Sequence, residues 1–226
     1  MSRPLKPPSR ADILEEELGV YDDLMASWMH GRRIKDRVEW SHWMAGIMYW
    51  PPYARNRVEL SGLVLEAAER EGSYTHAQRE WVDMVLATHL DTNVVMRTHL
   101  PDAIGAGVRP EAIAAVRSGN EEELTEEEAT LADYIRRVVD GKVTDESFEA
   151  VRQIMGTRGV AEYTIFITVL QETMRQFQAF GATDPSDEEV DQLLADIREG
   201  RKPVPPDWRE RAVGPWENEA VTPPAV

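Results

Sequence analysis

Residues 79–99 read REWVDMVLATHLDTNVVMRTH and place two chemically active side chains on two helical segments. A capping box at residues 75–78, with the pattern Thr-x-x-Gln, predicts the start of the first helix, which should run to about His89. A turn after it can fold the next helix back into a hairpin. Glu80 on the first helix and His99 on the second should then lie within direct or single-water hydrogen-bond reach.

The second helix of this hairpin should present one face to its partner. Thr92, Val95, Met96 and His99 follow the spacing i, i+3, i+4 and i+7, which gathers them on one face if Asp91 or Thr92 caps the helix. A buried carboxylate beside an imidazole can handle protons. Burial raises the carboxyl pKa and the imidazole favours its ionised form, so the two pKa values can both approach neutral pH.

The rest of the chain also predicts helices, and no segment alternates with the period of a strand, so the fold class is all-α. Further helices are expected over residues 11–30, 38–50, 58–70, 110–119, 125–138, 148–155, 160–180 and 186–200. Pro101 should kink or end the helix that carries His99. From Arg201 onward, frequent prolines predict an extended tail, in which Trp208 and Trp216 should pack against the chain or a neighbouring subunit.

Composition excludes several functions. The net charge of −16 argues against nucleic acid and anionic membranes as partners. The chain has no cysteine, so it can form neither a disulfide nor a thiolate site. Residues 1–10 are polar and lack the apolar core of a secretory signal, and no run is long enough to span a bilayer. These features predict a soluble cytoplasmic protein.

The spacing of the residues that lead up to His99 resembles that of the alkylhydroperoxidase D-like and carboxymuconolactone decarboxylase family. That family's signature spacing is E-x11-C-x2-C-x3-H, and this chain has Glu80, Thr92, Val95 and His99 at the four positions. The run Thr-His-Leu-Pro that includes His99, with the two glycines that follow it, is also similar. The resemblance covers residues 40–181. It implies an N-terminal helical extension over 1–39, the family domain over 40–181, and a C-terminal helix with its tail over 182–226.

The resemblance implies homotrimers or hexamers with the site near a subunit interface. Glu80 and His99 would relay protons, whereas Thr92 and Val95 cannot replace the redox cysteines, because no sulfenate can form. The expected function is therefore a cofactor-free acid–base enzyme, of decarboxylase, isomerase or lyase type. Its small-molecule substrate would be an organic acid, a lactone or another enolisable compound. The alternative is a non-catalytic ligand-binding or structural oligomer of the same fold.

Several side chains are expected to line the substrate cavity, and each also has a structural alternative. The expected substrate-binding residues are Thr92, Val95, Met96, His89, His42 and Trp43. Thr92 could instead be a helix cap, His89 a helix end, and His99 a core histidine.

Glu80 could be a structural carboxylate paired with Arg79 or Arg97. Glu80, His89, Asp91 and His99 contain the ligand types of a facial triad, but their spacing matches no metal motif. The prediction is accordingly no metal and no cofactor.

Overall fold

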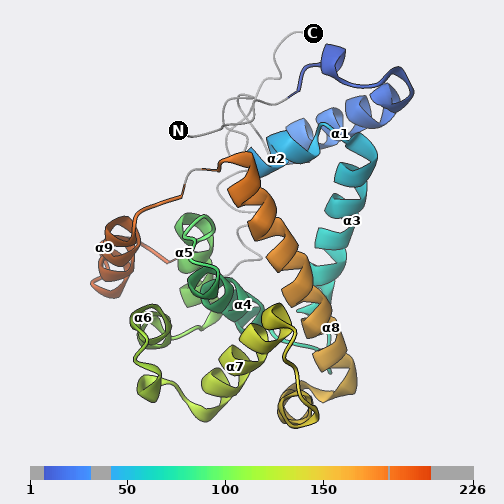
Figure 1. Ribbon diagram of the computed structural model, residues 1–226. Helices are drawn as coiled ribbons and strands as arrows, with labels where there is room; N and C mark the ends of the chain where they lie inside the picture. Colours follow the sequence, from blue (N-terminus) through green and yellow to red (C-terminus); the bar gives the residue numbers. More distant parts are fainter. Residues whose placement is uncertain (1–7, 32–41, 183, 205–226) are drawn as a thin grey trace. The chain divides into compact units, whose positions relative to one another are not determined.

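The computed structural model describes residues 8–31, 42–182 and 184–204. Every regular element in these residues is a helix, and none is a strand (Figure 1). The all-α prediction is therefore confirmed for this part of the chain. None of the helices described is both long enough and apolar enough to cross a membrane.

The chain forms two compact units, and the first combines residues 8–31, 42–63 and 175–182. Its elements are η1 (Arg10–Asp12), η2 (Glu15–Glu17), α1 (Leu18–Gly31), α2 (His42–Ile47), the first part of α3 (Pro51–Ala67) and the end of α8 (Asp145–Phe180). Its core consists of the buried side chains of Ile13, Tyr21, Leu24, Ile47, Met48 and Ala54.

The second unit combines residues 64–174 and 184–204 and carries the site. Its elements include α4 (His76–His89), α5 (Met96–Ala106), α6 (Pro110–Ser118), η4 (Glu121–Glu123), α7 (Glu126–Asp140), most of α8 and α9 (Asp187–Arg198). Helix α4 packs against α5, α6 and α7 and lies between them (Figure 1). Residues 80–87 of α4 are all buried, so any charged side chain there is held away from water.

Capping residues set the helix boundaries in the second unit. Capping boxes begin α4 at Thr75, α7 at Thr125 and α9 at Ser186, and the helix predicted to end near His89 ends there. Helix α6 begins with a proline at its first position and is closed by Gly119 in the left-handed conformation, as the sequence indicates. The structure confirms these boundaries. They could be predicted because each is set by residues within a few positions of it.

Three predicted boundaries shift in the structure. The helix expected over 11–30 begins only at Leu18, after two short 3-10 turns. The helix expected over 58–70 begins at Pro51, because proline fits the first turn of a helix as well as it stops the preceding one. Of the helix expected over 38–50, only residues 42–47 are helical in the described part. The tail that carries Trp208 and Trp216 lies outside the described residues.

The start of α5 differs from the prediction. The backbone N–H of Thr92 donates to the carbonyl of Ala87 at 3.0 Å, so the chain is still turning there and α5 begins only at Met96. Thr92 therefore does not share a helical face with His99. Pro101 lies inside α5 rather than ending it. Only the bond to the carbonyl of Arg97 is lost, and the helix continues past it.

Candidate functional site

The packing of α4 against α5 brings Glu80 and His99 together. The His99 Nδ1 atom lies 3.0 Å from Glu80 Oε2, within direct hydrogen-bond reach. The Glu80 side chain is fully buried, whereas the His99 side chain is 31% exposed. Within the described residues, the other ring nitrogen of His99 has no hydrogen-bond partner. The pair thus joins a buried carboxylate to an imidazole that reaches the surface.

A second carboxylate, which the sequence analysis missed, lies beside this pair. Asp83 follows Glu80 by three positions on α4, and its Oδ2 atom lies 3.6 Å from His99 Nδ1. Its side chain is 1% exposed, and neither of its oxygens accepts a hydrogen bond from any described residue. The signal in the sequence was the spacing of three, which places both acids on one face of α4.

Arg79 and His76 surround the other oxygen of Glu80. The Arg79 guanidinium forms an ion pair with Glu80 Oε1, and His76 Nε2 lies 3.6 Å from the same oxygen. The pairing with Arg79 matches one of the two structural partners considered for Glu80. Arg97, the other, pairs instead with Glu189 at 3.5 Å. Glu80 therefore pairs with Arg79 through Oε1 and with His99 through Oε2.

Burial and neighbouring charges shift the pKa values of Glu80, Asp83 and His99 in different directions. Burial alone would raise the pKa of Glu80, but His99 and Arg79 outweigh it and lower that pKa. Burial raises the pKa of Asp83 to about 6, although His99 opposes the shift. Burial would lower the pKa of His99, yet Asp83 and Glu80 raise it to about 9. The expectation that Glu80 and His99 both titrate near neutral pH is wrong, because His99 stays protonated there and Glu80 ionised.

The remaining predicted site residues have other surroundings. Val95 and Met96 are buried apolar side chains at the start of α5. His89 Nε2 lies 2.9 Å from Asp140 Oδ1 at the end of α7. The side chains of His42 and Trp43 lie outside the described part of the chain. A cavity-lining role for these residues stays a prediction.

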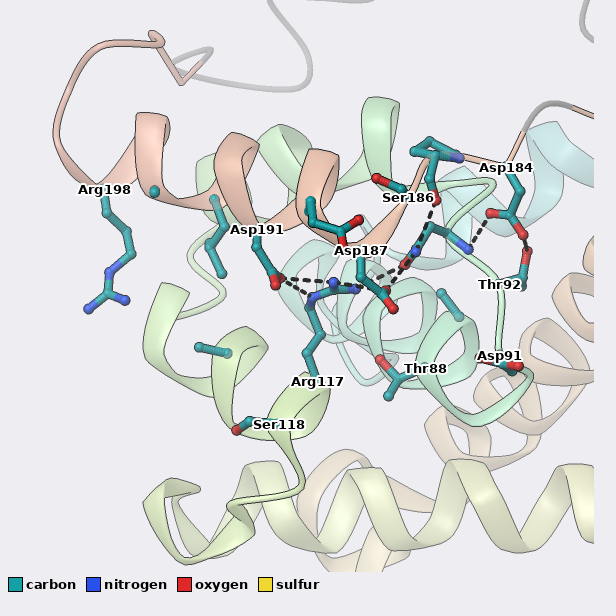
Figure 2. A pocket seen from close by; sticks show the side chains of 17 residues that line it. Thr88, Asp91, Thr92, Arg117, Ser118, Asp184, Ser186, Asp187, Asp191 and Arg198 are labelled. Atoms are coloured by element: carbon teal, nitrogen blue, oxygen red, sulfur yellow. Dashed lines mark hydrogen bonds and ion pairs between the residues drawn. The ribbon is translucent and has the colours of Figure 1, made fainter.

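Thr92 lines a pocket of about 1050 Å³ where α9 and α6 meet the end of α4 and the following turn (Figure 2). The hydroxyl of Thr92 donates to Asp184 Oδ2 at 3.0 Å. Arg117 donates to Asn93 Oδ1 at 2.9 Å and to Asp191 Oδ1 at 2.9 Å. Neither Glu80 nor His99 lines this pocket. Hydrogen bonds of Arg117 and Asn93 to Asp187 and Asp191 hold α9 to the rest of the unit.

One group of side chains in the described residues has the composition of a metal site. Glu80, Asp83 and His99 each offer a ligand atom, and these atoms lie within 4.8 Å of one another. The combination considered from the sequence, which included His89 and Asp91, is not the one that the structure brings together.

Comparison with known proteins found no match to this chain among protein-family models, curated proteins or solved structures.

Proposed function

We propose that this chain is an acid–base enzyme of the carboxymuconolactone decarboxylase-like type. The observation that supports the proposal is the contact between Glu80 and His99, which links a buried carboxylate to a partly exposed imidazole. The substrate class is a small organic acid, a lactone or another enolisable molecule, and the reaction is a decarboxylation, an isomerisation or an elimination. The active form is a homo-oligomer, a trimer or a hexamer, with the site near the subunit interface.

The proposed chemistry follows from the different surroundings of the two ring nitrogens of His99. Glu80 accepts a hydrogen bond from Nδ1–H and fixes the ring orientation, so Nε2–H points away from the carboxylates. A protonated His99 can donate from Nε2 to a carbonyl oxygen of the substrate as charge develops there, and it can accept the proton again afterwards. Positioned acid–base groups of this kind contribute about 10²- to 10⁴-fold to a rate.

Hydrogen–deuterium exchange tests the proposal without requiring the natural substrate. The full chain is incubated in D₂O with a carboxylated muconolactone, a β-keto acid and a 1,3-diketone, and loss of the acidic C–H signal is followed by NMR. We expect exchange with at least one probe, reduced about 10²- to 10⁴-fold in His99→Gln. Asp133→Asn is the control, because Asp133 pairs with Arg137 on the exposed face of α7. Equal exchange in the His99→Gln variant and the wild type would exclude His99 as the acid–base group.

The ion pair between Arg79 and Glu80 favours a second candidate, a structural role without catalysis. In that case Glu80→Gln leaves buried cationic groups without their partner, and the free energy of unfolding falls by about 1–3 kcal/mol. Measuring the melting temperature and the exchange rate on the same variant separates the two. Lost exchange with an intact fold supports the enzyme, whereas lost stability with no exchange in the wild type supports the structural role.

A further inference from the structure

We propose that Glu80, Asp83 and His99 form a binding site for a divalent first-row transition-metal ion, of which Zn²⁺ and Mn²⁺ suit the donor set best. The inference goes beyond the proposed function and does not depend on it, because ion binding is measured without a substrate. Two observations support it, namely the ligand distances and the surroundings of Asp83.

The distances between the ligand atoms suit a single ion. Zinc lies about 2.0–2.2 Å from imidazole nitrogen and carboxylate oxygen, so two such ligands at a tetrahedral angle are roughly 3.4 Å apart. His99 Nδ1 lies 3.0 Å from Glu80 Oε2 and 3.6 Å from Asp83 Oδ2, on either side of this value. All three ligand atoms lie within 4.8 Å of one another. Small side-chain rotations are enough to bring them around one ion.

The surroundings of Asp83 are the observation that points to a bound metal ion. A carboxylate that is 1% exposed normally accepts hydrogen bonds or faces a cation, because its burial is otherwise costly. Asp83 forms an ion pair with His99, but its Oδ2 atom lies 3.6 Å from Nδ1, and neither of its oxygens accepts a hydrogen bond within the described residues. A metal ion between them would satisfy that oxygen. The hydrogen bond of His99 already satisfies Glu80, so the contact between Glu80 and His99 alone does not explain why Asp83 is there.

The donor set and the charge define the class of ion. One imidazole and two carboxylates suit Zn²⁺ and Mn²⁺, whereas a site without sulfur gives no preference to Cu⁺. The two carboxylates neutralise a divalent ion, while Arg79, which contacts Glu80 Oε1, weakens the attraction without occupying Oε2. The side chain of His99 is 31% exposed, whereas those of Glu80 and Asp83 are buried, so His99 is the ligand nearest to the solvent.

An ion on Nδ1 replaces the hydrogen bond between His99 and Glu80. The ion-bound form and the hydrogen-bonded form are therefore alternative states of one site. In the ion-bound form the metal takes the Nδ1 position, and Nε2–H remains on the exposed side. Adding the ion to the exchange assay shows which state is active, whereas ion binding itself is decided by a separate measurement.

Calorimetry on the full chain tests the site. The protein is treated with a chelator, dialysed, and titrated with ZnCl₂ and, separately, with MnCl₂. We expect one ion per chain, and a loss of affinity of at least about 100-fold in Asp83→Asn and in His99→Gln, since even residues that only orient metal ligands cost 10- to 100-fold. Asp133→Asn makes the same chemical change at an exposed aspartate and should leave the affinity unchanged.

Two results would overturn the proposal. One is no binding of either ion to the wild type. The other is binding that is equal in the wild type, Asp83→Asn and Asp133→Asn, which would mean adventitious ions on a chain of net charge −16. If His99→Gln fails to fold, Asp83→Asn decides, because asparagine preserves the size of the side chain. Visible absorption of Co²⁺ bound to the wild type gives an independent readout, since its bands report the coordination geometry.

Discussion

Asp83 has surroundings that are unusual for a buried carboxylate. Its neighbours are His99 and Glu80, and it accepts no hydrogen bond from the described residues. Buried acids without a hydrogen-bond partner are rare, because the charge must leave water without replacement hydrogen bonds. Such positions are expected where a fold sacrifices stability for a function.

We expect Asp83→Asn to stabilise the chelator-treated protein. The pKa of Asp83 is raised from 3.8 to about 6 by burial, with His99 and Arg79 opposing the shift and Glu80 adding to it. The folded state therefore binds this proton more tightly than the unfolded state, and stability falls as pH rises from about 4 to about 6. Asparagine cannot ionise, so the free energy of unfolding should rise by about 1–3 kcal/mol at about pH 8 and change little at about pH 4.

Urea unfolding of both proteins at the two pH values measures this difference. Asp133→Asn serves as the control, because Asp133 is half exposed and pairs with Arg137. A lower stability of Asp83→Asn at both pH values would contradict the expectation and would make Asp83 a stabilising partner of His99.

The sequence predicts one half of the candidate site and misses the other. The contact between Glu80 and His99 follows from their positions on consecutive helices joined by a short turn, which local patterns can indicate. Asp83 was not distinguished, because in REWVDMVL it lies among apolar residues, and only the burial of all of residues 80–87 shows that it is enclosed. The prediction that Thr92 shares a helical face with His99 was wrong, since Thr92 precedes α5 and its hydroxyl binds Asp184, which lies 92 residues further along.

At the scale of the helices, local chemistry explains what could be predicted. Capping boxes and the pair Pro110 and Gly119 lie next to the boundaries that they set, so these boundaries were predicted correctly. The start of α5 was not, because a distant residue holds the turn before it. Pro101 was predicted to kink or end its helix, and it does not end it, since α5 continues to Ala106.

Helix α8 contains a break that only glycine accommodates. Gly156 has φ 75° and ψ 172°, and it separates the two helices predicted over 148–155 and 160–180. A side chain in this backbone conformation is strained, so Gly156→Ala should lower the free energy of unfolding by about 1–3 kcal/mol.

Gly62 provides the control for the substitution at Gly156. It lies inside α3 with no atom near the place of an added Cβ, and Gly62→Ala should raise stability by about 0.5–1 kcal/mol. Thermal unfolding of both variants gives the comparison. A free energy of unfolding that is unchanged or higher in Gly156→Ala would show that a side chain does not strain the break at Gly156.

At the scale of the whole molecule, we expect an oligomer. The resemblance in the sequence implies trimers or dimers of trimers, and several large apolar side chains are more than half exposed, among them Trp50, Leu63 and Ile165. Light scattering at micromolar concentration should give a mass of at least twice 25.7 kDa. The measurement is best made at moderate salt, since a net charge of −16 causes repulsion between copies. A single species with the mass of one chain would remove the interface from the proposed site.

The network that holds α9 also has a consequence for synthesis on the ribosome. Asp184 and Asp191 bind residues that precede them by 92 and 74 positions. At about 5–20 residues per second, Asp184 is added roughly 5–20 s after Thr92. During that interval the turn after α4 and the guanidinium of Arg117 are already made but have no aspartates to bind. The contacts that hold α9 in the second unit can therefore form only after α9 emerges.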